Sequence, residues 1–276
     1  MVDANALQYA KPDPQRDAAD RLGRLHGALE LKATLLALLL PGGSQRALRA
    51  YDIETADIRP APSLHEHVRN LPGPARLPWL ELLLARMALQ PLGLRQELLQ
   101  ATRRIMSARG TARPIDRLHW LLMRRALGEP LVAQPRPAPS GDVAEWLEPD
   151  LIAIGTYSAF LSRMVPEDAG DGAVGPANKQ WYAGVMEAWQ AAASLPGGEP
   201  PGGEAAIRAL STLQTLSLMQ RPVLVRGWVG GAVKLSRHFR LTDSAADALR
   251  LTCSLLDTPM PPELDRHFVT LEPAAK

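Results

Sequence analysis

The chain has 276 residues, of which 46% are hydrophobic and 22% are charged, and its formal net charge is only +2. This composition can bury a sizeable core, so it excludes a chain that is disordered throughout, and it carries no overall charge signature of nucleic-acid or membrane binding. Aromatic residues make up 5%, while leucine and alanine are abundant, which favours helices over strands.

The first strong helical signal is the apolar run at 33–40. Pro41, Gly42 and Gly43 end this helix, and Ser44 is suited to cap the next one. Eight apolar residues are too few to cross a bilayer, which requires roughly 20. The first residues contain no apolar signal-peptide region. We therefore expect a soluble, cytoplasmic protein.

The stretch SLHEHVRN, at 63–70, begins like the zinc-protease signature H-E-x-x-H. Two histidines on a helix share a face for zinc when they are four positions apart. Four positions after His65 stands Arg69, which does not ligate a metal. We predict no metal site here, and we interpret the stretch as a polar helix end before the bridge at 70–78.

The middle of the chain shows three apolar stripes at three- and four-residue steps, which predict three successive helices. Their members are Leu77, Leu80, Leu84 and Met87; Leu94, Leu98, Ala101 and Ile105; and Ile115, Leu118 and Leu122. The sequence QPLG separates the first helix of this group from the second. Runs that alternate with a period of two are absent from the sequence, which argues against strands.

Charge is unevenly distributed along the chain. The segment 76–125 contains ten arginines and three acidic residues, whereas 129–171 contains eight acidic residues and two arginines. These segments are either solvated surfaces or, for the first, a basic face that docks on an acidic partner surface. The candidate partner-binding residues are Arg86, Arg95, Arg103, Arg104, Arg113, Arg117, Arg124 and Arg125.

A proline-rich stretch near the middle of the chain predicts an extended linker. We place it at 131–142, between an N-terminal helical domain at 1–130 and a C-terminal helical domain at 143–276. Each domain is expected to form one lobe.

The C-terminal part also has helical patterns. Gly227, Gly230 and Gly231 lie within a helical stretch, where glycines favour close helix packing over phosphate binding. A later stripe predicts a helix capped by Thr242 or Asp243, with the lone Cys253 as a buried structural thiol. One cysteine cannot form a disulfide within the chain, which fits a reducing compartment. Pro261 and Pro262 are expected to stop this helix, and we leave open whether the final residues pack back.

Motifs for catalysis and cofactor binding are missing from the sequence. It contains no G-x-S-x-G nucleophile elbow, no P-loop and no G-x-G-x-x-G fingerprint. We therefore predict no catalytic residues, no cofactor, no metal ligand and no enzymatic activity.

Two segments share a helix–turn–helix plan, Arg103–Pro130 and Gly230–Leu264. Both resemble the TerB-like helical module of tellurite-resistance-type proteins. The second also carries RLTDSAADALRL and LLDTPMPPEL, and LPGPARLPWLELLLARMALQPL stands upstream. In this order the segments resemble the cytoplasmic tail of proteobacterial HtpX-like membrane zinc metalloproteases, without their protease domain. The resemblance implies an all-α fold in which each lobe ends in a TerB-like helix pair.

The acidic turn of TerB-like modules is largely lost in this chain. In the first segment the module's aspartate, glycine and later glutamate correspond to Arg109, Gly110 and His119. In the second segment the aspartate and glycine correspond to His238 and Phe239. There, Asp247 keeps an acid at the glutamate position. The resemblance therefore implies the fold and says little about chemistry.

Taken together, these features favour a non-catalytic helical adaptor or accessory subunit that binds protein partners in a larger complex. If that complex is membrane-bound, the protein would be cytoplasmic and peripheral to the inner membrane. A metal-binding regulator or an enzyme, with a site built from residues far apart in sequence, is the alternative. Nucleic-acid binding through 76–125 is a further alternative, although few aromatic residues are present to stack bases.

Overall fold

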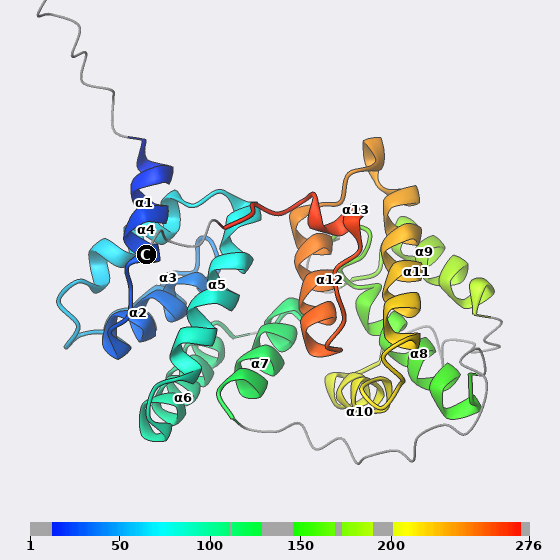
Figure 1. The fold of residues 1–276 in the computed structure, drawn as a ribbon, viewed down its shortest axis with the longest axis horizontal. Helices are drawn as coiled ribbons and strands as arrows, with labels where there is room; N and C mark the ends of the chain where they lie inside the picture. Colours follow the sequence, from blue (N-terminus) through cyan, green and yellow to red (C-terminus); the bar gives the residue numbers. More distant parts are fainter. Residues whose placement is uncertain (1–12, 111, 129–145, 169–172, 190–200, 272–276) are drawn as a thin grey trace, which may run out of the picture.

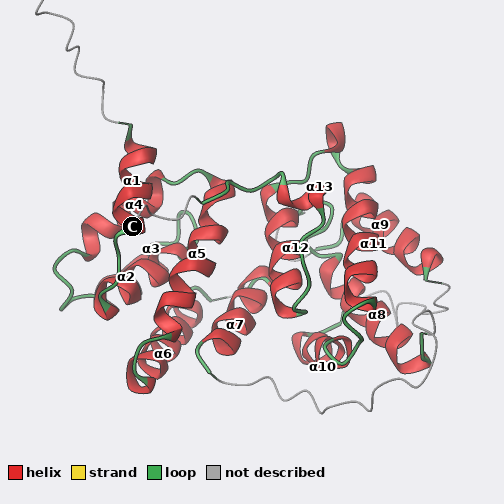
Figure 2. Ribbon diagram, viewed as in Figure 1, coloured by secondary structure: helices red, strands yellow, loops and turns green. Residues whose placement is uncertain are grey.

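The computed structural model describes residues 13–110, 112–128, 146–168, 173–189 and 201–271. Within these ranges the chain forms thirteen α-helices and the short 3₁₀ helix η2, with no strand (Figure 2). The prediction of an all-α fold is confirmed. The helices are α1 (Pro14–Gly23), α2 (Ala28–Leu38), α3 (Gln45–Glu54), α4 (Ala61–Asn70), α5 (Gly73–Ala88), α6 (Leu92–Ala108), α7 (Pro114–Ala126), α8 (Glu148–Leu161), α9 (Pro176–Ala188), α10 (Gly203–Leu213), α11 (Gln220–Leu235), η2 (Arg237–Phe239), α12 (Asp243–Leu255) and α13 (Pro262–Asp265).

The helices form two groups that meet in the middle of the molecule (Figure 1). On one side α2 packs against α4, α5 and α6, with α1 against α4 and α3 against α6. On the other side α8 packs against α10 and α9 against α11. Helices α7 and α12 lie between the two groups and pack against each other. One cluster of buried apolar side chains runs through both groups.

Helix α2 is the centre of the first group. Its residues from Leu31 to Leu38 are all buried, because the helix is apolar on nearly every face and other helices surround it. The polar exceptions are Thr34, whose hydroxyl donates to the carbonyl of Glu30, and Lys32, whose ammonium group forms an ion pair with Glu97 of α6. The apolar run at 33–40 is thus an internal helix whose one buried charge has a partner.

Local signals in the sequence define several helix ends as predicted. Ser44 caps α3 by accepting a hydrogen bond from the amide of Ala47, and Thr242 caps α12 in the same way through Ala245. The three apolar stripes of α5, α6 and α7 are buried, apart from half-buried Leu94. Cys253 is buried and free, as predicted.

Two of the three glycines of α11 serve helix packing as predicted, whereas Gly230 faces open space. A Cβ added at Gly231 would lie 3.4 Å from the ring of Trp181, and one at Gly227 would lie 3.4 Å from Trp189. Both tryptophans belong to the α9 segment, so the glycines let α9 and α11 approach closely. The indole N–H of Trp181 donates a hydrogen bond to the carbonyl of Trp228, and that of Trp228 donates to Ser158 of α8.

The two groups of helices are joined by polar contacts as well as by the shared core. Glu81 of α5 accepts hydrogen bonds from the guanidinium of Arg250 and the hydroxyl of Ser254, both on α12. Most contacts of α7 are with α12 rather than with α5 or α6. The linker predicted at 131–142 lies outside the described residues.

The last described residues, up to 271, pack back onto the helices. Helix α12 ends at Leu255, ahead of the prolines expected to stop it, and Asp257 adopts a positive φ of 50° just beyond. Pro262 then begins the short helix α13, which the sequence analysis did not anticipate. Phe268 is buried, and the guanidinium carbon of Arg250 lies over its ring, 4.5 Å from the ring centroid. The amide of Val269 donates a hydrogen bond to the carbonyl of Pro74.

Candidate functional site

Three of the arginines predicted to bind a partner hold the C-terminal ends of helices. Arg86 donates to the carbonyls of 22, 23 and 25 after α1, at 2.8–3.4 Å. Arg95 donates to Leu127 at the end of α7. Arg125 donates to Ser254 and Leu255 at the end of α12, and it pairs with Asp257. A cation at a helix C-terminus donates hydrogen bonds to carbonyls that have no partner within the helix. It also interacts favourably with the negative end of the helix dipole.

The remaining predicted arginines point toward different elements. Arg104 forms a bidentate pair with Glu54 of α3, Arg113 lies 3.8 Å from Asp116, and the guanidinium of Arg117 lies directly over Gly203 of α10. Arg103 is exposed, and Arg124 is half-buried. The high density of arginines in this segment of the sequence therefore does not produce one cluster of guanidinium groups on the surface. Partner binding through these arginines stays a prediction.

An exposed face of mixed apolar and basic character lies elsewhere, along α11. Met219 is 66% exposed and Val223 is 52% exposed, and Leu218 beside them is 73% exposed. Positions 219, 223, 226 and 234 fall on one side of a helix with 3.6 residues per turn. Arg226 and Lys234 are exposed, and neither makes an ion pair with another residue that the structure describes.

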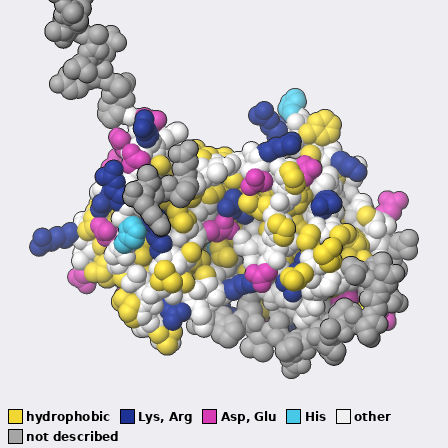
Figure 3. Space-filling model, in the orientation of Figure 1, with side chains coloured by type: hydrophobic (Ala, Val, Ile, Leu, Met, Phe, Trp, Pro, Cys, Tyr) yellow, Lys and Arg dark blue, Asp and Glu magenta, His cyan; other side chains and the backbone are white. Residues whose placement is uncertain are grey.

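The turn η2, beyond the other end of α11, is exposed as well. Phe239 is 74% exposed, with exposed Arg237, His238 and Arg240 around it. Lys, Arg and His side chains gather with apolar ones over the turn between α11 and α12 (Figure 3). We call this surface the α11–η2 face. It comprises Leu218, Met219, Val223, Arg226, Lys234, Arg237, His238, Phe239 and Arg240.

The backbone of the η2 turn is strained. His238 and Phe239 both have a φ of 55°, a conformation that costs a residue with a Cβ about 1 kcal/mol or more. Gly110, in the turn of the first helix–turn–helix segment, also has a positive φ, of 94°. This chain thus places an exposed aromatic ring where the turn geometry favours glycine.

A second feature is a polar cavity between the two groups of helices. It has a volume of about 330 Å³ and is lined from both sides, by Arg76 of α5, Asp116 and His119 of α7, and Asp243 and Asp247 of α12. His119 and Asp247 belong to different helix–turn–helix segments of the sequence. The fold brings them to one cavity although they are far apart in sequence.

Burial shifts the pKa values of both groups. Burial, reinforced by the neighbouring Asp243, raises the pKa of the Asp247 carboxyl to about 7. Burial lowers the pKa of the His119 imidazole to about 4, with Arg113, Arg76 and Arg109 acting in the same direction. At neutral pH the cavity therefore holds a neutral imidazole and a carboxyl group that is partly protonated.

The stretch SLHEHVRN forms most of α4, and its helix ends at Asn70 as predicted. The ring nitrogen Nδ1 of His67 lies 2.6 Å from the carbonyl of Ser63 on its own helix, whereas His65 packs against the ring of Tyr51. Within the described residues, no three His, Cys, Asp or Glu side chains are grouped so as to hold a metal ion.

Comparison with protein-family models, with curated proteins and with solved structures finds no match for the chain. Of the helices that the structure describes, none combines the length and the apolar content that crossing a bilayer requires. The resemblance to HtpX-like tails and TerB-like modules therefore stays a prediction from sequence.

Sequence reasoning missed the α11–η2 face, although signals for it were present. The run RHFR at 237–240 places an aromatic residue among cations, and Met219, Val223, Arg226 and Lys234 recur at helical spacing. These residues lie outside the arginine-rich segment at 76–125, in which the density of charge predicted the partner site. Exposure, rather than density, distinguishes the two regions.

Proposed function

We propose that the protein is a non-catalytic helical adaptor whose α11–η2 face docks on a protein partner. The observation that carries this proposal is the exposure of four large apolar side chains, Leu218, Met219, Val223 and Phe239, beside cations that make no ion pair with any described residue. Single exposed apolar residues are ordinary on protein surfaces. A group of them with adjacent charge is the pattern of an interaction site.

The chemistry of the face indicates the chemistry of its partner. Burying the apolar side chains would supply affinity at roughly 25 cal/mol per Å² of apolar area. Arg226, Lys234 and Arg237 would add attraction to carboxylates and would raise the rate of encounter. The partner is therefore a protein surface that presents apolar side chains bordered by aspartate or glutamate.

Helix α11 is closely packed on its inner side, which favours docking. Its inner side contacts Trp181 and Trp189 through glycines, and Trp228 is fully buried with its indole N–H bonded to Ser158. A partner would meet a preformed surface and would lose little binding energy to ordering it.

The test is quantitative co-purification of the full chain from its native host, followed by binding measurements with the protein recovered. The double variant Met219→Asp/Val223→Asp should lose that protein. The matched control is Ile53→Asp on α3, whose side chain is 75% exposed and lies outside the face. The control should retain the partner, and both variants should fold as the parent chain does.

Two results would overturn the proposal. One is a set of co-purifying proteins that is the same for the parent chain, the double variant and the control. The other is binding of the parent chain to vesicles with anionic lipid, lost in the double variant, with no protein retained. That second result would assign the face to a membrane surface instead.

A second candidate function rests on the cavity at α7 and α12. A carboxyl group with a pKa near 7, such as that of Asp247, suits proton transfer, so the cavity favours an enzyme or regulator with a non-local site. Elemental analysis of the purified full chain tests metal binding. A stoichiometric metal that is lost in Asp247→Asn would support this candidate, and a metal-free chain would count against it.

A further inference from the structure

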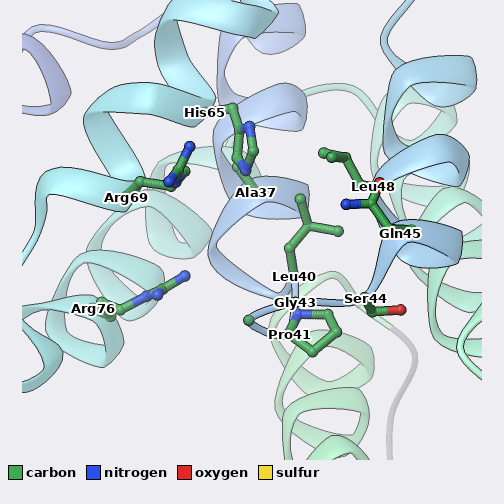
Figure 4. Close-up of a pocket in the computed structure, with 11 residues that line it drawn as sticks. Ala37, Leu40, Pro41, Gly43, Ser44, Gln45, Leu48, His65, Arg69 and Arg76 are labelled. Atoms are coloured by element: carbon green, nitrogen blue, oxygen red, sulfur yellow. The ribbon is translucent and has the colours of Figure 1, made fainter.

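A second cavity lies between α2, α3, α4 and α5, on the side of the molecule away from α11 (Figure 4). It adjoins the polar cavity at α7 and α12, and Arg76 lines both. Its volume is about 290 Å³, close to the lower limit of roughly 300 Å³ for small-molecule sites. One wall is apolar and consists of Ala37, Leu40, Pro41 and Leu48. The opposite wall consists of basic side chains.

Three basic groups converge on this cavity from two helices. His65 and Arg69 stand one turn apart on α4, and Arg76 comes from the first turns of α5. All three lie on one side of the end of α2, whereas Gln45 and Leu48 of α3 lie on the other side (Figure 4). The charges are close enough to affect one another, since Arg69 and Arg76 both lower the pKa of His65 after burial, the larger cause.

None of these three groups makes a hydrogen bond or ion pair with another described residue. This sets Arg76 apart from the other half-buried arginines, such as Arg86, Arg109 and Arg250, which all have partners. Burial lowers the pKa of Arg76, and Asp247, whose charge acts in the opposite direction, is partly protonated at neutral pH. A desolvated cation without a partner is costly, so an anion would stabilise this site.

The loop facing the three groups adds hydrogen-bond donors. Gly42 and Gly43 have open space where a Cβ would stand, and Gly43 has a φ of 82° that favours glycine. The loop leads into the N-terminus of α3, where Ser44 satisfies the amide of Ala47. The preceding amides of Gln45 and Arg46 have no partner among the described residues, and donors at this end of a helix favour an anion.

We propose that this cavity, which we call the Arg76 pocket, binds the phosphate group of a small organic phosphate ester. The guanidinium groups of Arg69 and Arg76 would contact the phosphate oxygens, as arginine does in charge-assisted hydrogen bonds. The amides of the α2–α3 loop would contact the same group from the other side. The apolar wall would cover the organic part of the ester, which distinguishes it from free phosphate.

The test is calorimetric titration of the full chain with phenyl phosphate and, separately, with inorganic phosphate. Phenyl phosphate should bind with saturation and at least about tenfold more tightly than inorganic phosphate. Arg76→Gln should lower the affinity for phenyl phosphate by about tenfold or more, and Arg76→Lys should lower it by less. The matched control, Arg103→Gln, removes an exposed arginine of α6 and should leave both affinities unchanged.

Three results would overturn the proposal: no saturable binding of either compound, equal affinities of the parent chain and Arg76→Gln, or equal affinities for the two compounds. Arg76 makes no hydrogen bond that folding requires within the described chain, so its variant should fold, as thermal unfolding will show. If it does not fold, Arg69→Gln replaces it, because Arg69 is exposed. This test involves no residue of the α11–η2 face, so its outcome is independent of the proposed adaptor function.

Discussion

The joint between α7 and α12 and the α11–η2 face are both rich in cations, yet the two regions use them in opposite ways. At the joint, Arg125 and Arg250 are fixed on carbonyls and on Glu81, and their charge holds the two groups of helices together. On the α11–η2 face, Arg226 and Lys234 are exposed and make no contact with described acids. Basic composition therefore does not indicate function until the partner of each cation is known.

The largest effect is expected from Glu81→Ala at the joint. This change leaves the half-buried guanidinium of Arg250 without its carboxylate and removes the acceptor of Ser254. We expect the free energy of unfolding to fall by about 3 kcal/mol, measured by urea denaturation. Glu204→Ala, at an exposed pair with Arg208, is the control and should change it by less than about 0.5 kcal/mol. Equal effects of the two changes would show that the joint is not held by this contact.

The cavity beside the joint predicts an unusual dependence of stability on pH. Between about pH 4 and pH 7 the unfolded Asp247 carboxyl is ionised while the folded one keeps its proton, so stability falls as pH rises. In the same range the unfolded His119 gains a proton that the folded one does not accept until about pH 4, so stability falls as pH falls. The two effects oppose each other in the parent chain.

Single variants should reveal each effect. In Asp247→Asn, stability should increase with pH from about 4.5 to 6.5, and in His119→Gln it should decrease with pH over the same range, by about 2 kcal/mol in each case. Urea denaturation at a series of pH values measures both slopes. Slopes of the same sign in the two variants would contradict the pKa assignments.

The same substitution in the two regions sharpens the comparison. Arg125→Met removes the donor that holds the end of α12 and should cost about 1.5 kcal/mol of stability. Arg226→Met should change stability by less than about 0.5 kcal/mol, because the side chain is exposed, but it should weaken binding of the partner. Thermal unfolding and partner binding are measured on both. Loss of binding in Arg125→Met alone would point back to the arginine-rich segment.

The smallest effect is expected at the strained turn. Phe239→Gly relieves a positive φ but adds freedom to the unfolded chain, so stability should rise by about 0.5 kcal/mol. Partner binding should weaken in the same variant, since the exposed ring is lost. Stability that falls instead would mean that the Phe239 ring has a structural role that its exposure does not suggest.

The helices themselves were largely predictable, because apolar spacing and caps are local properties. The stripes of α5, α6 and α7, the caps Ser44 and Thr242 and the burial of Cys253 follow from neighbouring residues alone. The C-terminal boundary of α12 was placed too late, since the prolines gave the only clear stop signal. The backbone instead turns at Asp257, where its side chain also pairs with Arg125.

The candidate sites were less predictable, because they depend on contacts between distant parts of the chain. Arg125 and the carbonyl of Leu255 are separated by 130 positions, so the sequence could not show that this guanidinium serves the fold. The Arg76 pocket likewise exists only once α4 and α5 face the loop after α2. Residue type identified the available chemistry, and tertiary packing decided which cations remain open to a ligand.

The end of α12 has a consequence for how the protein unfolds. Its last carbonyls are held by Arg125 of α7, by Gln214 after α10 and by Arg221 of α11, which donates to Leu256. Helix ends usually fray independently of the rest of a structure. Here the helix end is anchored by α7 and by the second group of helices, while Glu81 of α5, in the first group, accepts hydrogen bonds from Arg250 and Ser254 of the same helix. Neither group can therefore loosen without disturbing α12. The two groups are therefore coupled into one cooperative unit and should lose their structure in a single transition.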